Sequence, residues 1–302
     1  MGFMTSLKAG KAYKLQRKGE KQEAIRLYEE AFAEGFNDAR YNLAYALLII
    51  RDGQYQKAKD FLVKRQKTPM STEQRVEMLT DYAACCFRLG DIDKGIRTLE
   101  EQFRKTQTGL IYQTLGYLYV EKYDATNKPD FAKLAAEAAA AKAEEAEENE
   151  TPEETAVTET PETDEAVEAA AEGAETSEVP AEAKEPTPEE AWNAGVAKAE
   201  QFIRESIEYD DEDPICLDNM GQFLYRVLGQ KEEARAWFDK AIERKPGQID
   251  TLYFLSRYDE EAGDRAKALE RMEKAAEGRF SPLNYCTREM AQQEIERLKG
   301  AL

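Results

Sequence analysis

The chain has 302 residues, with 61 acidic and 42 basic side chains, a formal net charge of −19 and no histidine. The absence of histidine excludes imidazole-based acid–base catalysis and the zinc sites that combine cysteine with histidine. Strong acidity is also atypical of proteins that bind nucleic-acid phosphates, because those proteins need a basic face.

Residues 4–123 are predicted to form a series of short helices. Apolar residues recur there at spacings of three and four, without the alternation of apolar and polar residues that indicates strands. The start of the chain lacks the apolar core of a secretory signal, and the longest apolar run, residues 43–50, is too short to cross a bilayer. We therefore expect a cytoplasmic protein with no membrane partner, whose four cysteines stay reduced and pack as small apolar groups.

Residues 124–187 differ in composition from both flanks. Within residues 142–190 there are 19 acidic and 2 basic side chains, and no aromatic residue, leucine, isoleucine or methionine. Such a segment cannot bury enough apolar surface to offset the entropy of ordering it, so we expect a disordered acidic insert. Its beginning, residues 131–148, is rich in alanine and glutamate, and we expect a solvated helix there.

Residues 188–277 return to the helical pattern of the first part. A last helix is predicted over residues 282–300, where it would cover the open end of a stack of helices. Its apolar side is formed by Tyr285, Met290, Ile295 and Leu298.

A repeat of about 34 residues underlies both helical parts. The second helix of each unit carries a small residue, such as Ala24, Ala58, Ala234 or Ala268. A small residue in the preceding helix lies twelve positions earlier in four units, and thirteen earlier at Gly221. Small side chains at both positions let two antiparallel helices approach closely. The predicted turns between the helices carry Gly19, Gly53, Gly90, Gly229 and Gly263.

Three stretches carry a resemblance to a known family. Residues 219–225 (NMGQFLY), residues 234–238 (ARAWF) and residues 115–119 (LGYLY) resemble tetratricopeptide repeats. The resemblance covers roughly residues 4–123 and 188–277. It implies an all-α, right-handed superhelical solenoid of about six helix–turn–helix repeats, followed by the capping helix.

The fourth repeat is interrupted between its two helices. Its small residues, Gly116 and Ala199, are 83 positions apart instead of twelve. We therefore expect the acidic insert to lie inside this repeat, with residues 199–209 packed back against residues 110–120. Such an insertion is tolerable because the entropy of closing a loop grows only logarithmically with its length. Two independent domains joined by a linker are the alternative.

No motif for catalysis or cofactor binding is present. The sequence has no phosphate-binding loop, no dinucleotide-binding turn, and no set of base, nucleophile or metal ligands. We therefore expect no enzyme activity, and no catalytic residue, cofactor or metal.

Binding along the concave wall is the function that such a stack favours. On the first helix of each unit, residues beside the small position point toward that wall, and arginines lie near the helix ends. Tyrosine and arginine are typical of binding hot spots, although tyrosines at this spacing also pack between repeats, and both interpretations stay open. The predicted groove residues are Tyr13, Arg17, Arg88, Gln113, Tyr117, Asp218, Gln222, Arg226, Tyr253 and Arg257.

The leading hypothesis is a non-catalytic scaffold that holds a peptide or a partner helix in this groove. In the alternative, the acidic insert acts as a tethered pseudo-ligand of the same groove. The simpler interpretation of the insert is a solvated spacer. A third hypothesis, a cryptic enzyme or a helical repeat that binds nucleic acid, is disfavoured by the missing motifs and the acidity. The pattern names neither the partner protein nor an oligomeric state.

Overall fold

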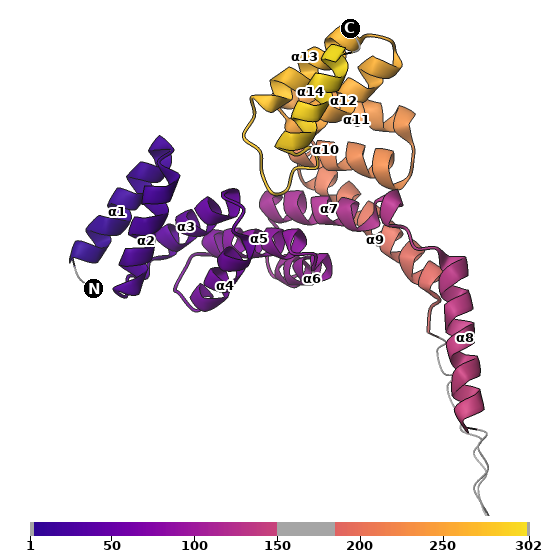
Figure 1. Ribbon diagram of the computed structural model, residues 1–302, viewed down its shortest axis with the longest axis horizontal. Coiled ribbons are helices and arrows are strands. Elements are labelled where there is room, and N and C mark those ends of the chain that lie inside the picture. The colour runs from indigo at the N-terminus through magenta and orange to yellow at the C-terminus, as the bar shows by residue number, and fades with distance from the viewer. Residues whose placement is uncertain (1–2, 150–184, 301–302) are drawn as a thin grey trace, which may run out of the picture. The chain divides into compact units, whose positions relative to one another are not determined.

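The computed structural model describes residues 3–149 and 185–300, and every regular element within those ranges is a helix (Figure 1). The chain divides into two compact units. The larger unit contains the described residues up to 128 and those from 195 onward. The smaller unit contains the described residues among 129–194.

Consecutive helices pair to form the larger unit, and we number the six pairs as repeats 1 to 6. The pairs are α1 (Phe3–Lys18) with α2 (Lys21–Ala33), α3 (Ala39–Arg51) with α4 (Tyr55–Arg65), α5 (Thr72–Arg88) with α6 (Ile92–Phe103), α7 (Gly109–Tyr123) with α9 (Pro188–Tyr209), α10 (Pro214–Gln222) with α11 (Lys231–Arg244), and α12 (Ile249–Glu261) with α13 (Arg265–Ala276). A final helix, α14 (Arg288–Gly300), packs against α13. The first helices of successive repeats are also neighbours, and we call the surface that they line the inner face.

The turns inside the repeats follow the predicted glycines. Gly19, Gly53, Gly90, Gly229 and Gly263 all have positive φ, between 69° and 86°. A side chain at such a position strains the backbone, whereas glycine adopts it freely. Short polar side chains cap the starts of α3, α5, α6, α7, α10 and α13. Ser71, for example, forms a reciprocal capping box with Gln74 at the start of α5.

Small residues permit the close helix crossings that the sequence predicts. The alanines of repeat 1, Ala12 and Ala24, have no exposed surface. In repeat 5 the crossing is closer still, because a Cβ added to Gly221 would lie 2.7 Å from a ring carbon of Phe238. The apolar core therefore runs between the two helices of each pair and onward between pairs.

The interrupted fourth repeat takes its second helix from beyond the insert. The rings of Tyr112 on α7 and Phe202 on α9 lie 5.2 Å apart. A Cβ added to Gly116 would lie 3.8 Å from Cγ1 of Ile203. α9 thus packs on α7 as the partner helix, although the two are far apart in sequence.

The acidic insert is only partly within the described residues. Its first part is α8 (Phe131–Asn149), where a solvated helix was expected, and the residues from Ala132 to Ala141 are exposed. In the same small unit, the ring of Phe131 contacts that of Trp192. The segment predicted to be disordered falls largely on residues 150–184, which lie outside the described residues.

The first helix of repeat 5 departs from the regular α-helical hydrogen-bonding pattern near its end. α10 ends at Gln222, and the helix continues as a π-helical turn over Phe223–Val227. A π-helical turn accommodates one additional residue within an α-helix. This turn explains why Gly221 precedes Ala234 by thirteen positions, where four other repeats have twelve.

The last helix begins later than the sequence predicts. Residues 282–287 were expected to be helical, but α14 starts at Arg288. The buried carboxylate of Asp250 accepts hydrogen bonds from the backbone N–H groups of Tyr285 and Cys286, and holds this segment outside the helix. The Thr287 hydroxyl then accepts from the N–H of Met290 and starts the helix. We call residues 279–287 the strap (the loop before α14 in Figure 1).

Candidate functional site

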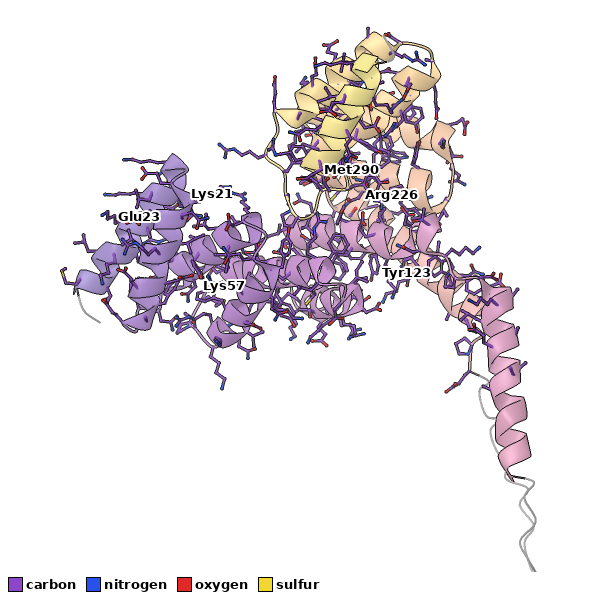
Figure 2. All side chains as sticks on the ribbon, in the orientation of Figure 1. Lys21, Glu23, Lys57, Tyr123, Arg226 and Met290 are labelled. Carbon is purple, nitrogen blue, oxygen red and sulfur yellow. The ribbon has the colours of Figure 1, made fainter. Side chains whose placement is uncertain are left out.

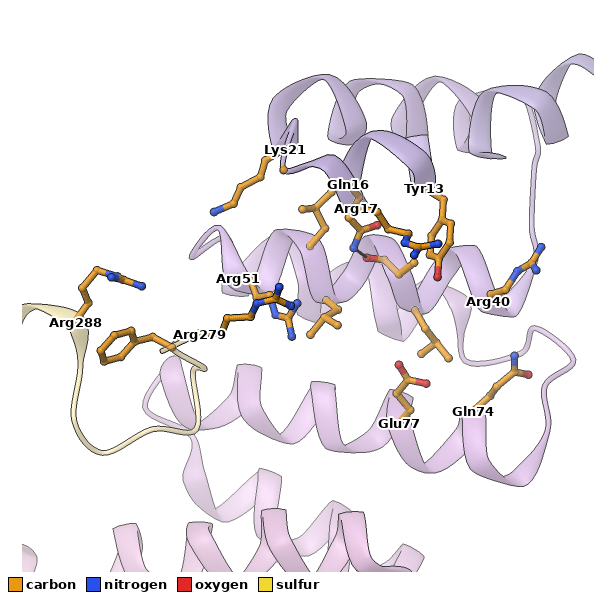
Figure 3. A pocket seen from close by; sticks show the side chains of 16 residues that line it. Tyr13, Gln16, Arg17, Lys21, Arg40, Arg51, Gln74, Glu77, Arg279 and Arg288 are labelled. Atoms are coloured by element: carbon orange, nitrogen blue, oxygen red, sulfur yellow. Dashed lines mark hydrogen bonds between the residues drawn. The ribbon is translucent and has the colours of Figure 1, made fainter. Parts of the chain in front are cut away.

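A concave pocket opens on the inner face of repeats 1 to 3. Its volume is about 970 Å³. Residues of α1, α3 and α5 form one part of the wall, and the strap with the first residue of α14 forms the other part (Figure 3). The pocket thus combines the beginning of the chain with residues close to its end.

Cationic side chains dominate the lining of this pocket. The described residues that line it include six cations and one carboxylate, that of Glu77. We call this site the basic pocket, and its cations are Arg17, Lys21, Arg40, Arg51, Arg279 and Arg288. Such a concentration of positive charge creates a local field that attracts anions, even though the whole chain is acidic.

These cations have no acidic partner among the residues that the structure describes. None of the six forms an ion pair with a carboxylate of the described residues, whereas Arg26 pairs with two glutamates on α2. Two of the six lie over aromatic rings, Arg40 over Tyr41 and Arg288 over Phe280, both at 4.5 Å. The contact of Arg40 leaves the edge of its guanidinium free to donate to a bound carboxylate. The guanidinium of Arg288 also donates to the carbonyls of Ala276 and Gly278, both at 3.3 Å.

The floor of the basic pocket is apolar. One face of α3 supplies it, and the rim carries two aromatic side chains, Phe280 and Tyr13, which is 37% exposed. The floor residues are Leu43, Ala44, Leu47 and Leu48. The site therefore offers both charge and apolar surface to a single ligand.

Two carboxyl groups of α5 have raised pKa values on this side of the molecule. Burial raises the pKa of Glu77. Burial and then repulsion from Glu77 raise the pKa of Asp81 to about 8, while Arg51 acts in the opposite direction. Oδ2 of Asp81 is buried without a hydrogen-bond partner among the described residues. Because Asp81 is largely protonated at neutral pH, it does not cancel the charge of Arg51.

Two of the ten predicted groove residues line the basic pocket, and both are exposed: Tyr13 and Arg17. Three others, Gln113, Tyr117 and Asp218, line a smaller pocket of about 400 Å³ between α7, α10, α12 and the strap. The side chains of Gln113 and Asp218 form hydrogen bonds within the chain. Nε2 of Gln113 donates to Asp213 at 2.5 Å, and Asp218 accepts from the side chains of Gln222 and Thr251. Burial also raises the pKa of Tyr117 well above its usual value.

Arg226, which is labelled in Figure 2, lies in the π-helical turn. It is the centre of a buried polar network. Its Nε donates to Asp124 at 2.8 Å, and its Nη1 donates to Glu121 at 2.7 Å and to Gln222 at 2.8 Å. Burial opposes the charge, but the two carboxylates outweigh it and raise the pKa of Arg226. The predicted groove residues Gln222 and Arg226 are thus bonded to each other, and Arg226 is also bonded to Glu121 at the end of α7 and to Asp124 directly after it.

The remaining predicted residues contact the C-terminal segment or each other. Nε of Arg88 on α5 donates to the carbonyl of Pro282 in the strap at 2.7 Å. Arg257 donates to Glu294 of α14 at 3.0 Å and to the hydroxyl of Tyr253 at 2.9 Å. The structure therefore leaves the inner face open at the basic pocket, while the strap and α14 engage the inner face of repeats 4 to 6.

Neither a metal site nor a membrane span emerges from the described part of the chain. No cluster of three or more acidic or cysteine side chains is arranged to hold a metal ion within residues 3–149 and 185–300. No helix there combines the length and apolarity needed to cross a membrane. The four cysteines are buried thiols, in agreement with the sequence prediction.

Comparisons with known proteins identify the fold. The family model described as anaphase-promoting complex, cyclosome, subunit 3 matches residues 17–102. A thermophilic tetratricopeptide-repeat protein from Thermus thermophilus superposes with a TM-score of 0.53 at 12% identity, over 87% of this chain and 99% of that one. The protein has the tetratricopeptide-repeat fold. The resemblance predicted from the repeat spacing is confirmed at this level.

Two further solved structures with tetratricopeptide repeats are similar at lower scores. The C-terminal part of a repeat-containing protein from Cytophaga hutchinsonii has a TM-score of 0.47 at 14% identity, covering 89% of this chain and 78% of that one. The yeast Sti1 TPR2AB domain, solved with an HSP90 peptide, has a TM-score of 0.36 at 18% identity and covers 99% and 98%. No curated protein sequence matches this chain significantly.

Five of the six cations of the basic pocket, and the aromatic residue Phe280, were absent from the sequence prediction. One of these cations, Arg51, follows the spacing of the repeats. Arg51 lies five positions after the small residue Ala46, as Arg17 does after Ala12. The repeat spacing does not indicate Arg279, Phe280 and Arg288, because these residues line the pocket only through the course of the strap. The others are Lys21 and Arg40.

Proposed function

We propose that the protein is a non-catalytic interaction scaffold that binds an acidic segment of a partner protein in the basic pocket. The observation that carries this proposal is the set of six cations that form no ion pair with the described carboxylates, placed above an apolar floor. Arginine is the side chain best suited to a carboxylate, because its planar fork donates two parallel hydrogen bonds. Five of the six cations are arginines.

The apolar floor favours a peptide over a bare anion or a nucleic acid. Leu47 is half-buried, and Leu43 and Leu48 are nearly buried. The exposed part of this apolar floor would stay in contact with water under a phosphate or a strand of phosphodiesters, whereas a leucine or phenylalanine of a peptide would cover it. Nucleic-acid binding also needs a basic stripe along the surface, and the cations here converge on one pocket. The favoured ligand is therefore a short segment in which glutamate or aspartate alternates with apolar side chains.

A binding titration tests this proposal. The probe is a short fluorescein-labelled peptide of glutamate interspersed with leucine, followed by anisotropy at low and at physiological salt. We expect Arg17→Glu combined with Arg51→Glu to weaken binding by about tenfold or more, because two charges that attract the ligand become repulsive. The matched control is Lys14→Glu, since Lys14 is exposed on the same helix as Arg17 but does not line the pocket.

Two outcomes would contradict the proposal. An equal loss of binding in Lys14→Glu would show unspecific attraction to the charge of the protein, and not a site. Displacement of the peptide by a single-stranded RNA that binds more tightly would favour the nucleic-acid alternative.

A second candidate makes the acidic insert the occupant of the basic pocket. Residues 142–190 carry 19 acidic and 2 basic side chains, and the cations of the pocket have no partner among the described carboxylates. In this case, deletion of residues 142–190 raises the affinity for the same probe peptide, and raises it most at low salt, where charges are least screened. An unchanged affinity at low salt would leave the insert as a solvated spacer.

A further inference from the structure

The strap lies on the inner face of repeats 4 to 6 with contacts of the kind that bind an extended peptide. Asp250, only 4% exposed, accepts from the backbone N–H groups of Tyr285 at 3.2 Å and Cys286 at 3.0 Å, and from the side-chain amide of Asn284 at 3.1 Å. Burial raises the pKa of Asp250, and these three donors oppose that rise, so they stabilise its ionised form. The charged carboxylate of Asp250 and the hydrogen-bond donors of the strap therefore stabilise each other.

An aromatic anchor accompanies these hydrogen bonds. The ring of Tyr285 stacks on Phe254 with centroids 5.3 Å apart, and the guanidinium of Arg226 lies 3.9 Å from its centroid. The edge of the Tyr253 ring meets it at 5.6 Å. Tyr285 is half-buried, and an aromatic side chain that packs on another ring and lies under an arginine is a usual composition of a dominant contact in an interface.

The strap also reaches the first half of the solenoid. The hydrogen bond from Arg88 to the carbonyl of Pro282 joins α5 to residues almost two hundred positions later. The strap therefore contacts α5, the π-helical turn after α10, and α12 at once, and its course is fixed at both sides of the inner face.

This course places the ends of the strap at the basic pocket. Arg279 and Phe280 belong to the strap, Arg288 follows it directly, and all three line the pocket. The pocket thus has one wall built by α1, α3 and α5, and a second wall whose position depends on the contacts of Asp250 and Tyr285.

From these contacts we propose that the strap is an intramolecular ligand of the inner face, and that Asp250 and Arg226 are positioning residues that hold it as the second wall of the basic pocket. This inference rests on the proposed function for its binding readout, because it assigns part of the affinity for an acidic peptide to residues far from the first wall. The inner face of repeats 4 to 6 is, on this view, a binding surface that the chain itself fills.

Paired substitutions of Tyr285 test the inference. Tyr285→Ala removes the ring that stacks on Phe254, whereas Tyr285→Phe retains it and serves as the control. We expect Tyr285→Ala to accelerate hydrogen exchange of the backbone amides of residues 279–287 and to weaken binding of the glutamate–leucine peptide by about threefold to tenfold. In Tyr285→Phe, both the exchange rates and the affinity should stay at the wild-type values.

A milder variant covers the case in which Tyr285→Ala fails to fold. Asn284→Ala removes one donor to Asp250 from a half-buried position, and a smaller change in the same two measurements is expected. Arg279→Glu should weaken peptide binding without changing the exchange of residues 284–287, because it alters the charge of the second wall and leaves the anchor intact.

The outcomes separate this inference from the proposed function. If the wild-type protein does not bind the peptide, the proposed function fails, and the role of the second wall fails with it. If the wild type binds and Tyr285→Ala binds equally well despite faster exchange in the strap, the proposed function stands and the inference is overturned. Unchanged exchange in Tyr285→Ala would show that Tyr285 does not anchor the strap, and this too overturns the inference.

Discussion

The two halves of the inner face use the same repeat position in opposite ways. Five residues after the small residue of the first helix, repeats 1 and 2 carry Arg17 and Arg51, and repeat 5 carries Arg226. The first two are exposed in the basic pocket and form no ion pair with the described carboxylates. Arg226 is buried and bonded to Asp124 and Glu121. The position of an arginine within the repeat therefore does not determine whether its side chain is available to a ligand or stabilises the fold.

The charge of the neighbouring repeat accounts for this difference. Glu121 occupies the same position in repeat 4, five residues after Gly116, and it faces Arg226 of repeat 5. Opposite charges at this position in successive repeats can form a buried ion pair, provided that other groups satisfy their remaining hydrogen bonds. Arg17, Arg51 and Arg88 repeat the same charge over three successive repeats, and like charges keep such a surface open to an anionic ligand.

The largest effect that we expect from this contrast concerns stability. Arg226→Ala should lower the free energy of unfolding by about 3–5 kcal/mol, because it leaves the buried carboxylates of Asp124 and Glu121 without their partner. Arg51→Ala, the control from the open half, should change it by no more than about 0.5 kcal/mol. Urea denaturation followed by circular dichroism measures both. Equal losses in the two variants would abolish the distinction between the halves.

The close approach of the C-terminal segment to α12 offers a second test. A Cβ added to Gly278, just before the strap, would lie 2.7 Å from Cγ1 of Ile249 and 3.0 Å from the carbonyl oxygen of Ala275. Gly278→Ala should therefore lower the free energy of unfolding by about 1–3 kcal/mol through overpacking. At Gly247, a Cβ would meet no atom within 4 Å, so Gly247→Ala is the control and should be neutral. Neutral behaviour of both variants would mean that the segment is not pressed onto α12.

The periodic features of this fold were predictable from the sequence, and its non-periodic features were not. Turn glycines such as Gly19 and Gly229 and the small residues at helix crossings recur at fixed spacing, so the helix pairs and the split fourth repeat could be inferred. The course of the strap could not be predicted, because the apolar side chains of residues 285–298 have the spacing of a helix. Only the distant carboxylate of Asp250 competes for the backbone N–H groups of that segment.

The residues of the candidate site were likewise predictable only where they follow the repeat spacing. Tyr13 and Arg17 were found from the repeat, and Arg51 could have been found in the same way. The burial of Arg226 was not visible, because it depends on a π-helical turn in its own helix and on the Tyr285 ring that covers it. Contacts that join segments far apart in sequence leave no periodic signal in either segment.

A smaller effect, with a distinct pH dependence, is expected at Asp81 beside the basic pocket. Its folded-state pKa of about 8 lies above the value near 4 of an unfolded aspartate, so the folded state retains a proton between those pH values. The wild type therefore loses stability as the pH rises through this range. Asp81→Asn removes the titration and should be more stable than the wild type by about 1–2 kcal/mol at pH about 8, and by much less at pH about 5.

Urea denaturation of Asp81→Asn at both pH values measures this change. Asp211→Asn, at an exposed turn position, provides the control and should show no such pH dependence. A constant difference between Asp81→Asn and the wild type at the two pH values would exclude the buried, protonated carboxyl.

The smallest change in stability is expected for a substitution at the rim of the basic pocket. Such a substitution can change the affinity for the peptide while it leaves folding almost unchanged. Tyr13 makes an edge contact with Tyr41, with ring centroids 6.1 Å apart, and Tyr13→Ala should lower the free energy of unfolding by no more than about 1 kcal/mol. Tyr209, 51% exposed and in contact with the ring of Tyr112 outside the pocket, is the matched control. Anisotropy with the glutamate–leucine peptide should show weaker binding for Tyr13→Ala and wild-type binding for Tyr209→Ala. If both variants bound as the wild type does, the open half would owe its affinity to charge alone, and the apolar part of the proposed ligand would have no support.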